Sequence, residues 1–226
     1  MTCVAEPDLT PRAEQTRTAI TEAALRLFRE KGYEATTMRA IAQEAGVSTG
    51  NAYYYFGSKE ELVQQFYAHN HADHLAACRA ILQAETEFAP RVRGTLRALI
   101  DVNGPYHAFA ARFFKHAAEP SSPLSPFSKE SSPAREAAIA LWREVVDGSA
   151  TRIDRELRGQ LPELLWLYSM GIVLFWVHDT SPGCAKTYRL IDRTVPLADR
   201  LVALSRVRIM RSTIRDIVSI IADMRA

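Results

Sequence analysis

The segment from Ser48 to Lys59 carries side chains that could bind a nucleic acid. Its uncharged polar members include Ser48, Thr49, Asn51, Tyr53 and Tyr54. Hydroxyl and amide groups form hydrogen bonds with phosphate oxygens and base edges, and Lys59 adds a full positive charge. The same spacing also fits the aromatic corner of an ordinary helical bundle, so the residue types alone leave both interpretations open.

Other kinds of chemistry have weaker support. His71, His74 and Cys78 would share one face of a helix, where they could hold a soft divalent metal with one outside ligand. An ordinary helix surface explains the same spacing. The sequence contains no G-x-G-x-x-G motif, no phosphate-binding P-loop and no H-E-x-x-H motif. We therefore expect no enzyme activity, no catalytic residue, no metal site and no cofactor.

The overall charge excludes a protein that binds nucleic acid through bulk positive charge. The 226 residues include 28 Lys and Arg against 26 Asp and Glu, which gives a formal net charge of +2. Residues 12–62 carry seven basic and seven acidic side chains. A nucleic-acid site must therefore depend on where individual charges are placed.

Cysteine usage and hydropathy predict a cytoplasmic protein with no membrane partner. Cys3, Cys78 and Cys184 are odd in number and widely separated, which argues against a disulfide framework. Residues 1–15 mix charges without an apolar run, unlike a signal peptide. The most apolar stretch, residues 164–177, is shorter than the roughly 20 residues that a membrane span needs. We expect it to be a buried helix.

The hydrophobic pattern predicts an all-α fold. Apolar residues recur at intervals of three and four, as on the face formed by Ile20, Ala24, Leu27 and Phe28. This first helix should begin at Thr10-Pro11 and end at Lys31-Gly32. Residues 119–133 are rich in proline and serine and should form a long loop, and residues 180–183 should form a shorter break.

The segment after the first helix has closely spaced helix starts and stops. Residues 36–37 can cap a second helix, which Gly46 would end. Ser48 can cap a third, short helix that ends near Phe56, and residues 58–61 form a capping box for a fourth. The second and third helices have the layout of a helix-turn-helix, whose second helix lies in the major groove of DNA.

A helical wheel predicts which side of the third helix meets the duplex. At about 100° per residue, Ala52, Tyr55 and Phe56 form an apolar side. The opposite side carries Thr49, Gly50, Tyr53 and Tyr54, with Asn51 at the border. We also expect phosphate contacts at the helix starts near Thr37 and Lys59, with a further charge from Arg39.

A longer set of residues between positions 18 and 62 carries a family resemblance. The set comprises Thr18-Ala19-Ile20, Leu27-Phe28, Lys31-Gly32-Tyr33, Thr36-Thr37, Ile41-Ala42, Ala45-Gly46-Val47-Ser48, Tyr53, Tyr55-Phe56 and Ser58-Lys59-Glu60-Glu61-Leu62. It resembles the DNA-binding domain of the TetR family of transcriptional regulators. The resemblance implies an all-helical homodimer that binds a palindromic operator and usually represses transcription.

The resemblance also implies individual DNA contacts. The positions that touch DNA in the family correspond to Thr36, Thr37, Thr49, Gly50, Tyr53, Tyr54 and Lys59. Adding Arg39, Ser48 and Asn51 completes the predicted contact set. The family often has Thr or Ser at position 51 and Leu or Ile at position 52, where this chain has Asn51 and Ala52. The base preference of relatives therefore does not carry over.

The remaining chain should sense a small molecule and form the dimer. We predict a flexible N-terminal arm (1–12), a helix-turn-helix domain (13–62) and a ligand-binding and dimerisation domain (63–226). Aromatic side chains could line an apolar pocket, although such stripes also occur in ordinary cores. The predicted ligand contacts are Tyr106, Phe109, Phe113, Trp142, Trp166 and Tyr168.

Two helices are predicted to form the dimer contact, mainly because of the resemblance. One spans about residues 161–177, and the other, about 206–224, carries an isoleucine-rich face opposite an arginine-rich one. The arginines could touch DNA or a lipid surface, although a solvated face is the commoner arrangement.

The sequence thus predicts a ligand-responsive dimeric regulator that binds double-stranded DNA, most simply a repressor released by an apolar or aromatic effector. An activator would look the same. The alternative is a helical carrier of small molecules or metal with a non-functional helix-turn-helix.

Overall fold

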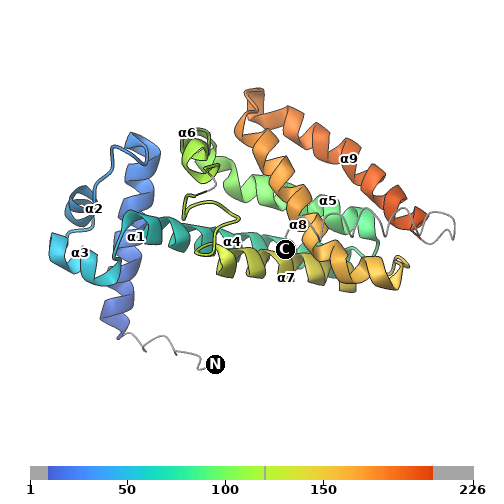
Figure 1. Ribbon diagram of the computed structural model, residues 1–226, viewed down its shortest axis with the longest axis horizontal. Coiled ribbons are helices and arrows are strands. Elements are labelled where there is room, and N and C mark those ends of the chain that lie inside the picture. Colours follow the sequence, from blue (N-terminus) through green and yellow to red (C-terminus); the bar gives the residue numbers. More distant parts are fainter. Residues whose placement is uncertain (1–9, 120, 206–226) are drawn as a thin grey trace. The chain divides into compact units, whose positions relative to one another are not determined.

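The computed structural model describes residues 10–119 and 121–205 of the chain. Over these residues it contains α-helices and two short 3-10 helices and no strand, so the all-α prediction is confirmed (Figure 1). The elements are α1 (Pro11–Lys31), α2 (Met38–Glu44), α3 (Thr49–Tyr55), α4 (Lys59–Ala84), α5 (Phe88–Asn103), η1 (Gly104–Tyr106), α6 (His107–Ala117), α7 (Ser132–Asp147), α8 (Arg155–Val177), η2 (Pro182–Cys184) and α9 (Ala185–Leu204).

The chain divides into two compact units. The first unit contains the residues up to His69 together with Ala108–Ser131, and the second contains Asn70–His107 and the residues from Ser132 onward. The continuous helix α4 contributes to both units, and nearly all of α6 belongs to the first.

The first unit has one apolar core beneath α1, α2 and α3. Its buried members include Ile20, Leu27 and Phe28 of α1, Ile41 of α2, Ala52 of α3, Leu62, Val63 and Phe66 of α4, and Phe109 and Phe113 of α6. The non-helical segment before α7 is tied to α4. Gln64 Nε2 donates to the Pro123 carbonyl at 2.8 Å, and the Tyr67 hydroxyl donates to the Leu124 carbonyl at 3.1 Å.

The second unit packs α5, α7, α8 and α9 around buried aromatic side chains. Figure 1 shows α9 running beside both α5 and α8. Among the described residues, α8 is long and apolar enough to cross a membrane by length and composition alone. It is longer than the predicted stretch because it begins at Arg155. Trp166 and Trp176 of α8 are buried, as in the core helix that the sequence predicts.

A buried arginine joins the ends of two helices in the second unit. Arg91 donates to the carbonyls of Leu82 and Glu85, at 2.7 and 2.8 Å, where α4 ends. It also donates to the carbonyls of Glu144 and Val145, both at 2.8 Å, where α7 ends. The last carbonyls of a helix have no partner within it and carry partial negative charge. One guanidinium therefore donates to four backbone carbonyls at these two helix ends.

A buried carboxylate holds the turn between α8 and α9. Asp179 accepts hydrogen bonds from the backbone N–H and the hydroxyl of both Ser181 and Thr187. Burial alone would raise the pKa of Asp179, but these four hydrogen bonds outweigh burial and hold the pKa below its usual range. The turn also contains two positive φ angles, 60° at Gly183 and 54° at Cys184.

The arginine contact predicts that Gly148→Ala destabilises the protein. A Cβ at residue 148 would lie 2.3 Å from Nη2 of Arg91, whose position is fixed by its carbonyl partners. We expect the free energy of unfolding to fall by about 1–3 kcal/mol, as in other overpacked sites. Urea unfolding measures this change.

Gly159→Ala is the matched control, because a Cβ there meets nothing within 4 Å and the residue lies inside α8. It should be neutral or stabilising by up to about 1 kcal/mol. Equal stability of the two variants would show that the Arg91 contact is not rigid.

Candidate nucleic-acid interface

Local hydrogen bonds build the turn between α2 and α3. Thr37 caps the start of α2, and its hydroxyl accepts the N–H of Ala40 at 3.2 Å. Gly46 adopts a φ of 70°, and the Val47 N–H returns to the Ala42 carbonyl at 2.9 Å. These are the cap and the glycine stop that the sequence predicts.

Ser48 caps the start of α3, since its hydroxyl accepts the N–H of Asn51 at 3.1 Å. Residues 46–50 also match G-x-S-x-G, a pattern found around catalytic serines of hydrolases. That chemistry requires a strand-to-helix turn, whereas α2 precedes this serine. Ser48 is therefore a helix cap in this setting.

The third helix has one buried side and one exposed side, as the wheel predicts. Ala52 is completely buried, and Phe56 at the end of the helix is buried with it. On the other side Tyr53 is 51% exposed and Tyr54 is 80% exposed. The core thus anchors α3 from behind and leaves its hydroxyl-bearing face open.

Three residues, 56–58, separate the end of α3 from the start of α4. Ser58 accepts the N–H of Glu61 at 3.3 Å, and the Glu61 carboxylate accepts the N–H of Gly57 at 2.8 Å. The predicted capping box therefore forms, with its return bond shifted by one residue. Lys59, the first residue of the helix, is half-buried and donates from Nζ to the Tyr33 carbonyl at 2.9 Å.

The structure places most of the predicted DNA-contacting residues on the surface of the first unit. Exposed members are Thr37, Arg39, Ser48, Thr49, Gly50, Asn51, Tyr53 and Tyr54. Thr36 is different, because it is completely buried and its hydroxyl donates to the Gly32 carbonyl at 2.8 Å. A side chain without accessible surface does not reach a phosphate, so we remove Thr36 from the contact set. The sequence could not separate these two adjacent threonines.

The predicted ligand-contacting aromatics are divided between the two units. Phe109 and Phe113 are buried in the first unit, with ring centroids 5.1 Å apart, and Phe109 also stacks on Phe28 at 5.9 Å. Their helical spacing fits a core face as well as a pocket wall, and here they contribute to the core. Burial in a core does not test contact with a ligand, so both contacts stay predictions.

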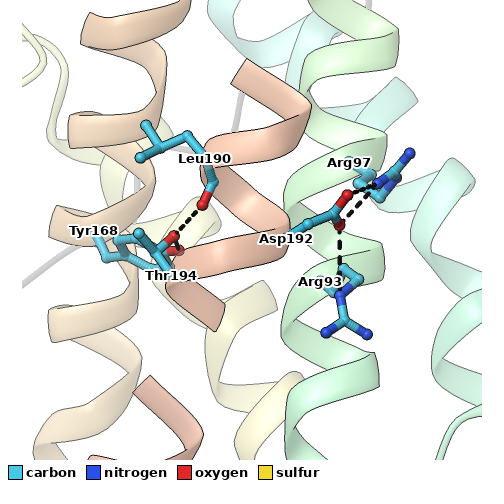
Figure 2. Close-up of polar contacts among 6 residues, drawn as sticks. All are labelled: Arg93, Arg97, Tyr168, Leu190, Asp192 and Thr194. Carbon is cyan, nitrogen blue, oxygen red and sulfur yellow. Dashed lines mark hydrogen bonds and ion pairs between the residues drawn. The ribbon is translucent and has the colours of Figure 1, made fainter. Parts of the chain in front are cut away.

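The remaining aromatics belong to the second unit. Trp142 and Trp166 are buried, and Tyr106 and Tyr168 are half-buried. Tyr168 is hydrogen-bonded to the hydroxyl of Thr194, which itself donates to the Leu190 carbonyl at 2.7 Å (Figure 2). Because Thr194 uses its proton on that carbonyl, Tyr168 is the donor, and burial raises its pKa.

Figure 2 also shows that Asp192 of α9 meets Arg97 at 2.9 Å and Arg93 at 3.6 Å on α5. These contacts and the Tyr168 bond join α9 to its two neighbours. The helix α9 was not predicted from the sequence. The spacing of Thr187, Ile191, Val195 and Val202, which are all buried, could have indicated it.

His71, His74 and Cys78 of α4 are not arranged as a set of metal ligands. A ring nitrogen of His74 lies 2.9 Å from the Thr95 carbonyl, and burial raises the pKa of the Cys78 thiol to about 11. A thiol that stays protonated is a poor metal ligand. Within the described ranges, no three His, Cys, Asp or Glu side chains are arranged to hold a metal ion.

Comparison with known proteins gives a family for both parts of the chain. Residues 20–66 match "Bacterial regulatory proteins, tetR family", and residues 91–220 match "Tetracyclin repressor-like, C-terminal domain". The chain belongs to the TetR family. The matched residues 20–66 contain α2 and α3, so this pair is the helix-turn-helix of the family. Its second helix, α3, presents the exposed face described above.

Curated relatives of this TetR-family chain match it over part of their length. The regulator TtgR of Pseudomonas putida is 40% identical over 88 residues, which are 39% of this chain and 40% of that one. HbdR of an Aromatoleum species is 47% identical over 60 residues, 26% and 25% of the two chains. The matched region thus spans less than half of these relatives.

Solved structures show the same fold. The TetR-family repressor FadR of Thermus thermophilus, solved with lauroyl-CoA, has a TM-score of 0.58 at 24% identity, covering 79% of this chain and 92% of that one. A Syntrophomonas wolfei structure described as a putative TetR-family regulator has a TM-score of 0.63 at 15% identity, covering 82% and 95%. At these identities the likeness concerns the fold alone.

The core assignment of Phe109 predicts a large stability effect. Phe109→Ala should lower the free energy of unfolding by about 3–5 kcal/mol, because it leaves a cavity among stacked rings. Phe127→Ala is the control, since this phenylalanine of the same unit is 62% exposed and should change stability by less than about 1 kcal/mol. Thermal unfolding of both variants is the measurement. A near-neutral Phe109→Ala would contradict the core assignment.

Proposed function

We propose that this TetR-family chain is a cytoplasmic dimeric repressor that binds a palindromic DNA operator and is released by a small molecule. The observation that carries the proposal is the exposed hydroxyl face of α3, held from behind by Ala52 and Phe56. A helix that presents polar groups outward from a helix-turn-helix is suited to the major groove.

The proposed DNA contacts combine the groove-facing helix with two helix starts. Nothing lies within 4 Å of a Cβ at Gly50, so α3 is free to approach a duplex closely there. The hydroxyls of Tyr53 and Tyr54 would reach phosphates or base edges. The starts of α2 and α4 would bind phosphates through backbone N–H groups. The proposed set is Thr37, Arg39, Ser48, Thr49, Gly50, Asn51, Tyr53, Tyr54 and Lys59.

The proposed dimer contact lies on the second unit. Leu197, Leu201 and Leu204 recur along α9 and are exposed, as are Leu174 and Phe175 of α8. Exposed apolar stripes of this kind mark interaction surfaces, and a twofold dimer would match a palindromic operator. The other predicted contact helix, residues 206–224, lies outside the described residues.

The proposed effector is an apolar or aromatic small molecule bound by the second unit, with Tyr106, Trp142, Trp166 and Tyr168 as candidate contacts. The FadR proteins of Thermus thermophilus and Bacillus subtilis were solved with lauroyl-CoA and stearoyl-CoA, which carry long apolar chains. Release requires that the effector bind the DNA-incompetent state more tightly. Moving a 99:1 population to 1:99 takes roughly 5.5 kcal/mol of differential binding.

Selection of bound fragments from genomic DNA tests this function. The purified protein should retain a small set of fragments that share an inverted repeat, and genes beside them would suggest the effector. Fluorescence anisotropy of the recovered duplex then measures affinity against salt. Absence of salt-dependent duplex binding would favour the carrier alternative. Transcription measured with and without the protein separates a repressor from an activator.

Two substitutions test the proposed contacts. Tyr53→Ala and Lys59→Ala should each weaken binding to the selected duplex without unfolding the protein. Lys59→Ala should also reduce the slope of log affinity against log salt by about one unit, because one phosphate contact is lost. Lys186→Ala is the control, since this exposed lysine lies on α9 in the second unit. Unchanged affinity in both test variants would contradict the assignment.

One substitution tests the dimer contact. Leu201 is 60% exposed, and Leu201→Glu would place a charge in the proposed apolar interface. We expect the variant to sediment as a monomer at micromolar concentration. It should also bind a palindromic duplex more weakly than the wild type does. Arg189→Glu, at an exposed position of the same helix about two turns before the first leucine of the stripe, should remain dimeric. A dimeric Leu201→Glu variant would place the interface elsewhere.

A further inference from the structure

We propose that Tyr33 is a positioning residue for DNA binding, which holds the ammonium group of Lys59 ready for a phosphate before the duplex arrives. The inference rests on the proposed function and adds a residue that does not itself touch DNA. Tyr33 precedes α2, and Lys59 begins α4, so the contact joins two elements of the first unit.

Two features of Tyr33 act on the same ammonium group. The Tyr33 carbonyl accepts a hydrogen bond from Lys59 Nζ at 2.9 Å, and the Nζ atom lies 4.3 Å from the centroid of the Tyr33 ring. The face of an aromatic ring attracts a cation at this distance. An ammonium group has three N–H donors, so two remain for a phosphate.

The ring of Tyr33 is itself held in place. Its hydroxyl donates to Oε1 of Glu60 at 2.5 Å. Its ring centroid lies 5.5 Å from that of Phe28 and 5.4 Å from that of Phe113. Burial and the Glu60 carboxylate raise the pKa of Tyr33, so the hydroxyl stays protonated and continues to donate. A ring fixed by core residues offers a rigid support to the flexible lysine.

Neighbouring carboxylates have partners of their own. Glu34 meets Lys115 at 3.1 Å, Glu60 accepts the Tyr33 hydroxyl, and Glu61 accepts the Gly57 N–H. Glu34 and Glu60 still attract the Lys59 ammonium electrostatically. The tyrosine ring is a weak partner, which a phosphate can supplement without a strong ion pair having to break.

The physical benefit is a smaller entropy cost on binding. A lysine that is free in solution loses much of its rotamer freedom when it grips a phosphate. A lysine that already rests on Tyr33 has lost part of that freedom during folding, so the bound complex gains in affinity.

A double-mutant cycle tests this role on the duplex selected by the wild-type protein. Tyr33→Leu should weaken binding about three- to tenfold when Lys59 is present, as expected for one loosened side chain. In the Lys59→Ala background, Tyr33→Leu should cost less than about twofold, because no ammonium remains to be positioned. Both Tyr33 variants keep the backbone carbonyl, but Tyr33→Phe also keeps an aromatic ring and should bind within about twofold of the wild type.

The outcomes separate this inference from the proposed function. If the wild type shows no salt-dependent duplex binding, both are overturned. If the wild type binds and Tyr33→Leu costs the same in both backgrounds, its role is structural and only the inference is overturned. Circular dichroism and thermal unfolding establish that each variant is folded.

A spectroscopic measurement on the wild type keeps the inference testable if Tyr33→Leu does not fold. The ring current of Tyr33 should shift the ε-methylene protons of Lys59 upfield in the DNA-free protein. Their signals are identified by their absence in Lys59→Ala. Signals at the positions of an unstructured lysine would show that the ring does not hold Lys59 and would overturn the inference.

Discussion

The proposed function depends on how a helix of seven residues is held in place. A helix as short as α3 is not stable alone, because too few hydrogen bonds offset the cost of ordering its backbone. Its stability and direction come from Ala52 and Phe56, which are buried in the core of the first unit. Burial of this side makes the opposite side the exposed one. Packing thus determines which groups are offered to a partner, while local caps determine where the helix starts.

Polar side chains perform a comparable task in the second unit, where they complete the ends of helices. Arg91 satisfies carbonyls at the ends of α4 and α7, and Asp179 satisfies donors at the turn into α9. Each is buried and would be costly without its partners, so each specifies one arrangement of the helices around it. Buried aliphatic and aromatic side chains together supply the apolar core, and these two residues fix how the surrounding helix ends meet.

Local signals in the sequence predicted more than tertiary ones did. The caps at Thr37 and Ser48 and the stop at Gly46 depend on neighbouring residues, so they could be placed correctly. The different burial of Thr36 and Thr37 depends on contacts from distant segments, which adjacent identical residues do not reveal. Phe109 and Phe113 show the same limit, since one helical stripe is equally suited to a core or a pocket. The role of Tyr33 depends on its distance from Lys59, which the sequence does not give.

The first unit is discontinuous, and this affects how the protein could be recombined with its relatives. Residues 108–131 supply Phe109, Phe113 and the Pro123 carbonyl to a core whose other members precede residue 70. A hybrid regulator that took only the N-terminal segment from this chain would lack these groups. In that hybrid, α1 of this chain would pack against side chains of the other regulator that do not fit it. A transplant that respects the packing has to carry both pieces, with the recipient chain spliced between them inside α4 and again at the start of α6.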